Sequence, residues 1–179
     1  MKKNFLFVCL LMSASAVFAQ QPKVNPVIRS YGSVWEIPDA DEKPDKKMKY
    51  KILVDITNNA DKPDTLNLYL EAIATLVNMH VSAGVPIKNL DVVVVVHKMG
   101  TYSILNQEKY RQKFKMDNPN LPLIKELSDA GVRFFVCGQN LIRGKIAASE
   151  ITPEVKVATS ALTALTTFGL KGYTRMNFK

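Results

Sequence analysis

The chain has 179 residues, of which 47% are hydrophobic and 22% are charged, and its formal net charge at pH 7 is +8. A chain of this size and composition buries one substantial core, which excludes an intrinsically disordered chain and a small fold that depends on disulfides. Positive charge favours anionic ligands, but the basic residues are scattered and form no arginine-rich or basic-aromatic motif. We therefore expect a single domain that has no nucleic-acid partner.

The first residues have the pattern of a secretory signal peptide. Lys2 and Lys3 are followed by a short apolar run over residues 5–12, and Ala19 precedes an acceptable cleavage site. This run is shorter than the roughly 20 apolar residues of a membrane-spanning helix, and no later stretch approaches that length. We therefore predict that residues 1–19 are removed and that the product is periplasmic or secreted, without stable membrane insertion.

Residues 20–48 differ in composition from the rest of the chain. They contain four prolines and most of a charged run over residues 39–49, which together indicate an irregular segment. Apolar residues such as Ile28, Val34 and Trp35 give this segment enough apolar surface to lie against a folded domain. We predict a docked N-terminal extension over residues 20–48 and one α/β domain over residues 49–179.

From residue 49 onward, β-rich and helical patterns alternate. A β-rich run over 50–57 precedes a helix that begins at Asp64 or Thr65 and ends at Gly84. Residues 90–97 include five consecutive valines, which is typical of a central strand in a parallel sheet. Further on, we expect helices over 107–114 and 121–130, a strand over 132–137, and a short helix over 139–143.

The last part of the chain predicts one more helix and one more strand. Thr152 as N-cap, Pro153 at the first helical position and Glu154 in the first turn predict a helix over 152–168. A short basic segment over 173–178 is expected to form a strand at a sheet edge. The whole order predicts an α/β fold, a three-layer α/β/α sandwich with a mainly parallel central sheet of about five strands.

Polar groups stand where three of the expected strands end. Asp55 and Asn58 belong to the first, His97 to the second and Cys137 to the third. In a parallel sheet these ends share one edge, where ligands and reactive groups collect, so residues far apart in sequence are expected to converge. Cys9 leaves with the signal peptide, and Cys137 is then the single thiol of the exported protein.

Each of these residues has a chemical role and a structural alternative. Cys137 is either a thiolate nucleophile, activated by the following helix and by His97, or a small buried core residue. His97 either accepts the thiol proton or caps a loop. Asp55 breaks an apolar strand, so its carboxylate needs a partner, which is either loop amides or a catalytic group that it orients. Gly138 leaves room for a ligand or for a sharp turn.

The sequence offers no basis for a cofactor or a metal. Only two histidines and two cysteines are present, and their spacing matches no zinc motif. Phosphate-binding glycine loops and the serine-hydrolase elbow are also missing from the chain. We therefore expect neither a cofactor nor a metal ion.

The valine-rich strand that ends at His97, the Asn118-Pro119-Asn120 turn and the Cys137-Gly138-Gln139 segment make the chain resemble the DsrE/DsrF-like family over roughly residues 50–177. The resemblance implies a parallel three-layer fold, frequent homo-oligomers, and a cysteine that carries sulfur as a persulfide. By position, Cys137 matches the sulfur-accepting cysteine, and Gly138 and Gln139 match its turn. Lys98 and Asn140 stand where exported relatives often have glycine and serine.

Together, the residues and the resemblance lead to the hypothesis of an exported sulfur carrier with sulfurtransferase-type activity through Cys137. His97 and the backbone after Cys137 would stabilise the anion, with Gly138, Gln139, Asn140, Asp55, Asn58 and Lys98 around a ligand. The expected partners are a small sulfur-containing or anionic ligand, or a protein that donates or accepts sulfur. The alternatives are a non-catalytic module that binds a small anion or a protein, and a thiol redox sensor, against which the lack of a second cysteine weighs.

Overall fold

The computed structural model describes residues 21–178. The predicted signal peptide therefore lies outside the described residues. Among those that are described, no helix is long and apolar enough to cross a membrane. The strands are β1 (Tyr50–Ile56), β2 (Leu90–Val96), β3 (Arg133–Cys137), β4 (Val155–Ala158) and β5 (Thr174–Met176). The α-helices are α1 (Leu68–Ser82), α2 (Gln107–Phe114), α3 (Leu121–Asp129), α4 (Gly138–Gly144) and α5 (Ala161–Leu170), with short 3-10 helices η1 (Ile87–Asn89), η2 (Lys98–Ile104) and η3 (Ala148–Glu150).

One five-stranded sheet, in the order β4-β3-β2-β1-β5, organises the domain. Every neighbouring pair of strands is parallel. The valine run lies in β2, the middle strand, where all five valines are buried because helices cover both faces of the sheet. The predicted α/β sandwich with a parallel sheet is therefore confirmed, and β5 is the edge strand expected from its sequence.

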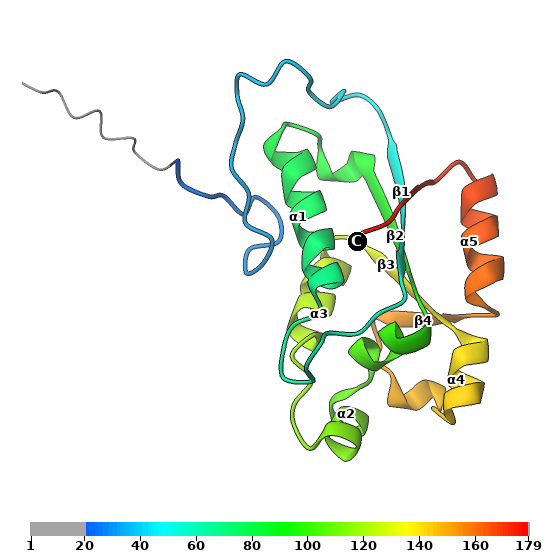
Figure 1. Cartoon of the computed structure of the whole chain (residues 1–179). Helices are drawn as coiled ribbons and strands as arrows, with labels where there is room; N and C mark the ends of the chain where they lie inside the picture. The colour runs from blue at the N-terminus through cyan, green and yellow to red at the C-terminus, as the bar shows by residue number, and fades with distance from the viewer. Residues whose placement is uncertain (1–20, 179) are drawn as a thin grey trace, which may run out of the picture.

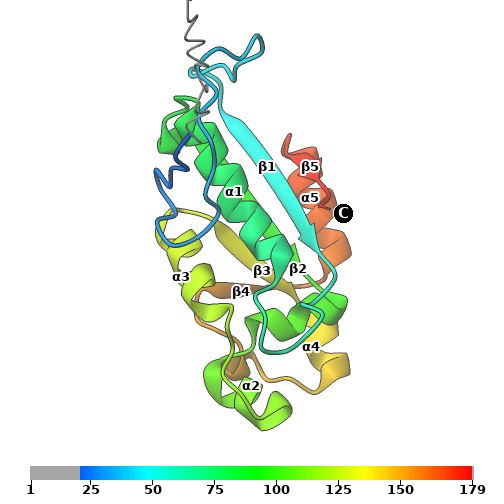
Figure 2. The ribbon, with the colours of Figure 1, turned by 60° about the vertical axis from the view of Figure 1, so that its left-hand side comes forward.

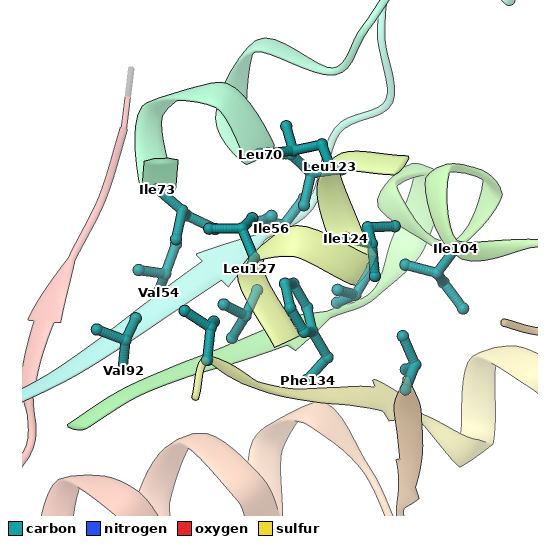
Figure 3. Close-up of a cluster of buried hydrophobic side chains, with 14 of the residues drawn as sticks. Val54, Ile56, Leu70, Ile73, Val92, Ile104, Leu123, Ile124, Leu127 and Phe134 are labelled. Carbon is teal, nitrogen blue, oxygen red and sulfur yellow. The ribbon is translucent and has the colours of Figure 1, made fainter. Parts of the chain in front are cut away.

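The two faces of the sheet are covered unequally. Helices α1 and α3 lie on one face and α5 lies on the other, as Figures 1 and 2 show. The larger core lies under α1 and α3 (Figure 3) and includes Val54, Leu70, Ile73, Val94, Ile124, Leu127 and Phe134. The smaller core under α5 contains Leu53, Val93, Val95, Cys137, Ala161 and Ala164. The face that carries Cys137 is thus closed by one helix, which contributes two buried alanines and the partly buried Leu165 and Phe168.

The predicted helix over 152–168 is wrong. Residues 155–158 form β4, which pairs with β3 from Val155 opposite Phe134 to Ala158 opposite Cys137. Helix α5 begins only after Ser160, whose side chain accepts a hydrogen bond from the backbone N–H of Thr163 (3.0 Å). The local capping signal at Thr152 was outweighed by the open edge of β3, because a β-branched segment there completes the backbone hydrogen bonds of the sheet.

The start of α1 also differs from the expectation. Its N-cap is Asn67, two residues beyond Thr65, and the Asn67 side chain accepts a hydrogen bond from the backbone N–H of Tyr69 (3.0 Å). The same side chain donates to the hydroxyl of Ser103 (2.7 Å), and the Asn67 backbone N–H donates to Asn120 (2.8 Å). Asn67 is fully buried, so this helix end is set by tertiary contacts as well as by local capping.

The N-terminal extension packs on α1 around a buried asparagine. The side-chain oxygen of Asn78 accepts hydrogen bonds from the backbone N–H groups of Val27 (3.1 Å) and Ile28 (2.9 Å). Its amide donates to the carbonyls of Ile28, Tyr31 and Gly32, each at 3.0 Å. Ile28 is fully buried and belongs to the larger core. This part of the extension is therefore an integral layer of the domain.

A polar cluster anchors the carboxyl end of α5, and the residues that follow it, to the sheet. Asp91 of β2 accepts hydrogen bonds from Arg133 of β3 (2.6 Å) and from the hydroxyl of Tyr173 (2.5 Å). The ring of Phe168 on α5 packs against that of Tyr173, with 5.1 Å between ring centroids, and the Arg133 guanidinium lies 5.6 Å from the Phe168 ring. Burial raises the pKa of Asp91, but these hydrogen bonds and the nearby positive charge outweigh burial and leave the pKa below its usual value.

This cluster predicts a pH-dependent contribution to stability. Because the folded-state pKa of Asp91 is lowered, its contribution is present above the unfolded value of about 3.9 and is lost as the pH falls through the folded value. We expect Asp91→Asn to reduce the free energy of unfolding at pH 7 by about 0.5–1 kcal/mol, the range of a partly exposed ion pair. Urea unfolding at pH 7 and at about pH 2 measures the difference, which should shrink in acid; an equal difference at both pH values would contradict this role.

Candidate functional site

Cys137 and His97 occupy neighbouring positions at the carboxyl edge of the sheet. Val96 of β2 is paired in register with Val136 of β3, and His97 and Cys137 are the next residues of their chains. His97 keeps an extended backbone (φ −154°, ψ −179°), so its side chain continues the alternation of β2 toward the α5 face. Cys137 belongs to the smaller core on that face. The structure thus places both residues at the same edge, as parallel pairing of the strands predicts.

Asp55 holds His97 from the next strand. Nε2 of His97 lies 2.7 Å from Oδ1 of Asp55, and the two side chains are only 14% and 6% exposed. The second carboxylate oxygen of Asp55 is paired with Arg175 of β5. A carboxylate that is paired with arginine can only accept hydrogen bonds, so Nε2 of His97 is the donor, and in the neutral form of the ring Nδ1 carries the lone pair. The partner of Asp55 on this side is therefore the His97 side chain, which it orients, and not a set of loop amides.

A diagonal of polar residues thus crosses four neighbouring strands on the α5 face. Arg175 is in register with Leu53, which lies two residues before Asp55 in β1. Asp55 is in register with Val95, which lies two residues before His97. From Arg175 to Asp55 and from Asp55 to His97 the diagonal advances by one strand and two residues, and His97 and Cys137 then lie at the same level on neighbouring strands. Arg175 was not singled out in the sequence, because only the order of the strands in space brings β5 next to β1.

Cys137 itself is closely packed, with 4% of its surface exposed. Its neighbours in the smaller core include Val95 of β2 and Ala161 and Ala164 of α5. Cys137 is the N-cap of α4, but its side chain makes no capping hydrogen bond. Helix α4 has only seven residues. The chemistry of the thiol therefore depends on its histidine neighbour and not on the helix end.

Gly138 is required by packing. A Cβ at this position would lie 2.8 Å from the carbonyl oxygen of Ala158 and 3.3 Å from a methyl group of Val157. The end of β4 therefore fills the space that the missing side chain leaves, so Gly138 permits a close approach and a sharp turn and leaves no room for a ligand. Gln139 follows in the first turn of α4 and is exposed.

The remaining predicted residues lie in two other places. Lys98 and Asn140 face each other across a groove between η2 and α4. Asn58 lines a separate hollow of about 910 Å³, which lies beyond the carboxyl ends of β1 and β5 and against the start of α1. The structure therefore brings Cys137, His97 and Asp55 together, but it separates Lys98 and Asn140 from Asn58.

No cluster of three or more metal-ligating side chains is found within residues 21–178. The diagonal supplies one thiol, one imidazole and one carboxylate that is already paired with arginine. This donor set suits proton transfer to and from a thiol.

The fold and the site define a class of protein: a parallel three-layer α/β sandwich with a thiol and an oriented histidine at the carboxyl edge of its sheet. Residues 49–178 match the model of the DsrE/DsrF-like family, and the chain belongs to that family. A solved protein of unknown function from Methanobacterium thermoautotrophicum has the same fold, with a TM-score of 0.53, 16% sequence identity, and coverage of 72% of this chain and 99% of that one. No curated protein matches the chain.

The geometry predicts the tautomer of His97. In the neutral form of the folded protein's His97 ring, we expect the proton on Nε2, because Asp55 accepts it, and a lone pair on Nδ1. Nitrogen-15 NMR of the ring distinguishes the two tautomers. Asp55→Asn should allow a mixture of tautomers, since an amide can either donate or accept, whereas Asp64→Asn, an exposed control, should leave the spectrum of His97 unchanged. An Nδ1-protonated ring in the unaltered protein would contradict the arrangement.

Proposed function

We propose that the protein carries sulfane sulfur as a persulfide on Cys137, with His97 as the base that removes the thiol proton. The observation that carries this proposal is the hydrogen bond between Asp55 and His97 one strand away from the thiol. Membership of the DsrE/DsrF-like family supports it, because sulfur relay is a function of that family.

The reaction needs no oxidant. Nδ1 of His97 takes the proton of Cys137, directly or through one water, and Nε2 continues to donate to Asp55. The thiolate attacks the outer sulfur of a donor persulfide, a bond forms between that sulfur and Sγ, and the bond between the two donor sulfurs breaks. The donor leaves as a thiolate with the electron pair. The positive charge that develops on the imidazole is stabilised by the Asp55 carboxylate.

Access to Cys137 requires movement of the chain that covers it. In its first turn, α5 contacts the smaller core through Ala161, which offers little apolar area, and Ala164 and Leu165 follow one turn later. At its carboxyl end, Phe168 packs between Phe135 and Tyr173, with ring centroids 5.5 Å and 5.1 Å apart. We therefore infer that the first turn of α5 opens while its last turn stays anchored.

The proposal includes a compartment and partners. Residues 1–19 read as a cleavable signal peptide, so sulfur transfer is proposed to occur outside the cytoplasm, in a homo-oligomer of the kind that the family resemblance implies. The sulfur donor and acceptor are proposed to be a small sulfur-containing anion or another protein.

A second candidate function is a binding module without turnover on the same fold. The burial of Cys137 favours it, because free cysteines are among the most frequently buried residues and pack as small apolar side chains. The two candidates make opposite predictions for the reactivity of the thiol in the folded protein.

Intact mass spectrometry separates the two functions. After incubation of the folded protein with inorganic polysulfide, we expect a mass increase of one or more sulfur atoms on Cys137 and none on Cys137→Ser. His97→Gln should slow this loading by about 100-fold, the lower range of general-base contributions. His80→Gln is the matched control, since His80 is the other histidine of the chain and its ring contacts a carbonyl of its own helix (2.8 Å).

The result that would overturn sulfur transfer is equally direct. A thiol that stays unmodified by polysulfide, and that reacts with iodoacetamide only after the protein is unfolded, identifies Cys137 as a packed core residue. In that case the binding function takes its place.

A further inference from the structure

A groove runs between η2 and α4, just beyond the carboxyl ends of β2 and β3. Its volume is about 350 Å³, and its walls include Lys98 and Tyr102 from η2 and Asn140 and Arg143 from α4. The groove continues past Tyr102 into a second hollow of about 300 Å³ that Lys109, Gln112 and Lys113 line. Among the described residues 21–178, no acidic side chain lines either hollow. The groove is therefore basic along its whole length.

A buried hydroxyl without a partner lies in the wall of the groove. Thr101 is only 2% exposed, and its Oγ1 makes no hydrogen bond with any group of residues 21–178. Buried hydroxyl groups nearly always have a partner, because an unpaired one loses its hydrogen bonds to water and gains none. Thr101 lines the groove, but its Oγ1 is itself covered, so this hydroxyl is an unpaired group beneath the groove wall and not a contact for a bound molecule.

Lys98 adds a second unusual feature. Its backbone is in the left-handed region (φ 53°), which is unfavourable for a residue with a side chain and is often found at functional sites. Within residues 21–178, neither Lys98 nor Arg143 forms an ion pair, in contrast to Lys109, which is paired with Glu150 at 2.9 Å. Two cations, one from η2 and one from α4, are thus available to an anion.

The groove also has an apolar part. Met99, Tyr102 and Ile146 contribute apolar surface to it, and the Nζ of Lys113 lies 4.4 Å from the centroid of the Tyr102 ring. An inorganic ion would leave this surface uncovered. A molecule with an anionic group and a small apolar body matches both halves of the groove.

We propose that this groove binds a small organic anion. Its carboxylate or similar oxyanion lies between Lys98 and Arg143, and its apolar body contacts Tyr102 and Ile146. Arginine favours such oxyanions because its guanidinium donates two parallel hydrogen bonds. The inference goes beyond sulfur transfer, because nothing in the groove depends on the state of Cys137.

Three probes of similar size or charge test the ligand class. Isothermal titration of the full chain with benzoate should give saturable binding at one site, and higher salt should weaken it. Benzamide, which has the same shape without the charge, and acetate, which has the charge without the ring, should each bind at least about 10-fold more weakly, the loss expected for one charged hydrogen bond or one apolar contact. Equal affinity for benzoate and benzamide would overturn the proposal.

Variants locate the site. Lys98→Asn and Arg143→Gln should each reduce benzoate affinity by about 10-fold, because each removes one charged partner. Lys115→Asn is the matched control: Lys115 also has a left-handed backbone (φ 62°) and the same charge, but it lines neither hollow. Loss of affinity in the control equal to that in Lys98→Asn would mean that net charge alone attracts the probe, and the proposal would fail.

Thr101→Val tests the hydroxyl with a side chain of nearly the same shape. Removal of an unpaired buried hydroxyl should raise the melting temperature of the free protein and leave benzoate affinity unchanged, because the hydroxyl is covered. A loss of affinity as large as that of Lys98→Asn would contradict this position of the hydroxyl. The same titrations on Cys137→Ser should match the unaltered protein, so that a failure of sulfur transfer and a failure of anion binding are measured separately.

Discussion

A carboxylate in an apolar strand constrains the rest of this structure. Asp55 lies between buried neighbours in β1, and a buried charge of this kind is costly unless charged or hydrogen-bonding groups surround it. Its partners come from the two strands on either side of β1, Arg175 from β5 and His97 from the end of β2. The same interaction therefore joins three strands and sets the orientation of the imidazole beside Cys137. Stability and potential chemistry depend on the same two oxygen atoms.

The two faces of the sheet are covered unequally, and this difference determines on which face the charged interaction lies. On the α1 and α3 face, large aliphatic side chains and Phe134 fill the space between helices and sheet, which leaves no position for a charge. On the α5 face, the core is small, and the only fully buried side chains that α5 adds to it, within residues 21–178, are Ala161 and Ala164. Polar groups can reach one another there without displacing a well-packed layer. The face with the weaker core is thus the face that carries the thiol, the histidine and the carboxylate.

Much of this arrangement follows from local sequence patterns, and the remainder follows from long-range pairing. The valine run identifies β2 as central, and parallel pairing then brings His97 and Cys137 to one edge. In contrast, residues 155–158 form a strand only because β3 offers an open edge, although Thr152 and Pro153 satisfy the local rules for a helix start. The contact between Arg175 and Asp55 has no local signal at all, since 120 residues separate them in sequence. The directions of the loops after β1 and β2 decide that Asn58 and Lys98 line different hollows, and short-range patterns do not encode these directions.

The two outer strands bear on how copies of the protein can associate. β4 has four residues and β5 has three, and exposed basic residues, Lys156 and Arg175, lie on them. Such short edges offer few backbone groups for a further strand, and the exposed Lys156 adds a charge that opposes pairing with the same edge of another copy. Growth of the sheet from one molecule into the next is therefore disfavoured. Any self-association would then use the helical surfaces, where Leu162 and Leu170 of α5 are among the most exposed apolar side chains.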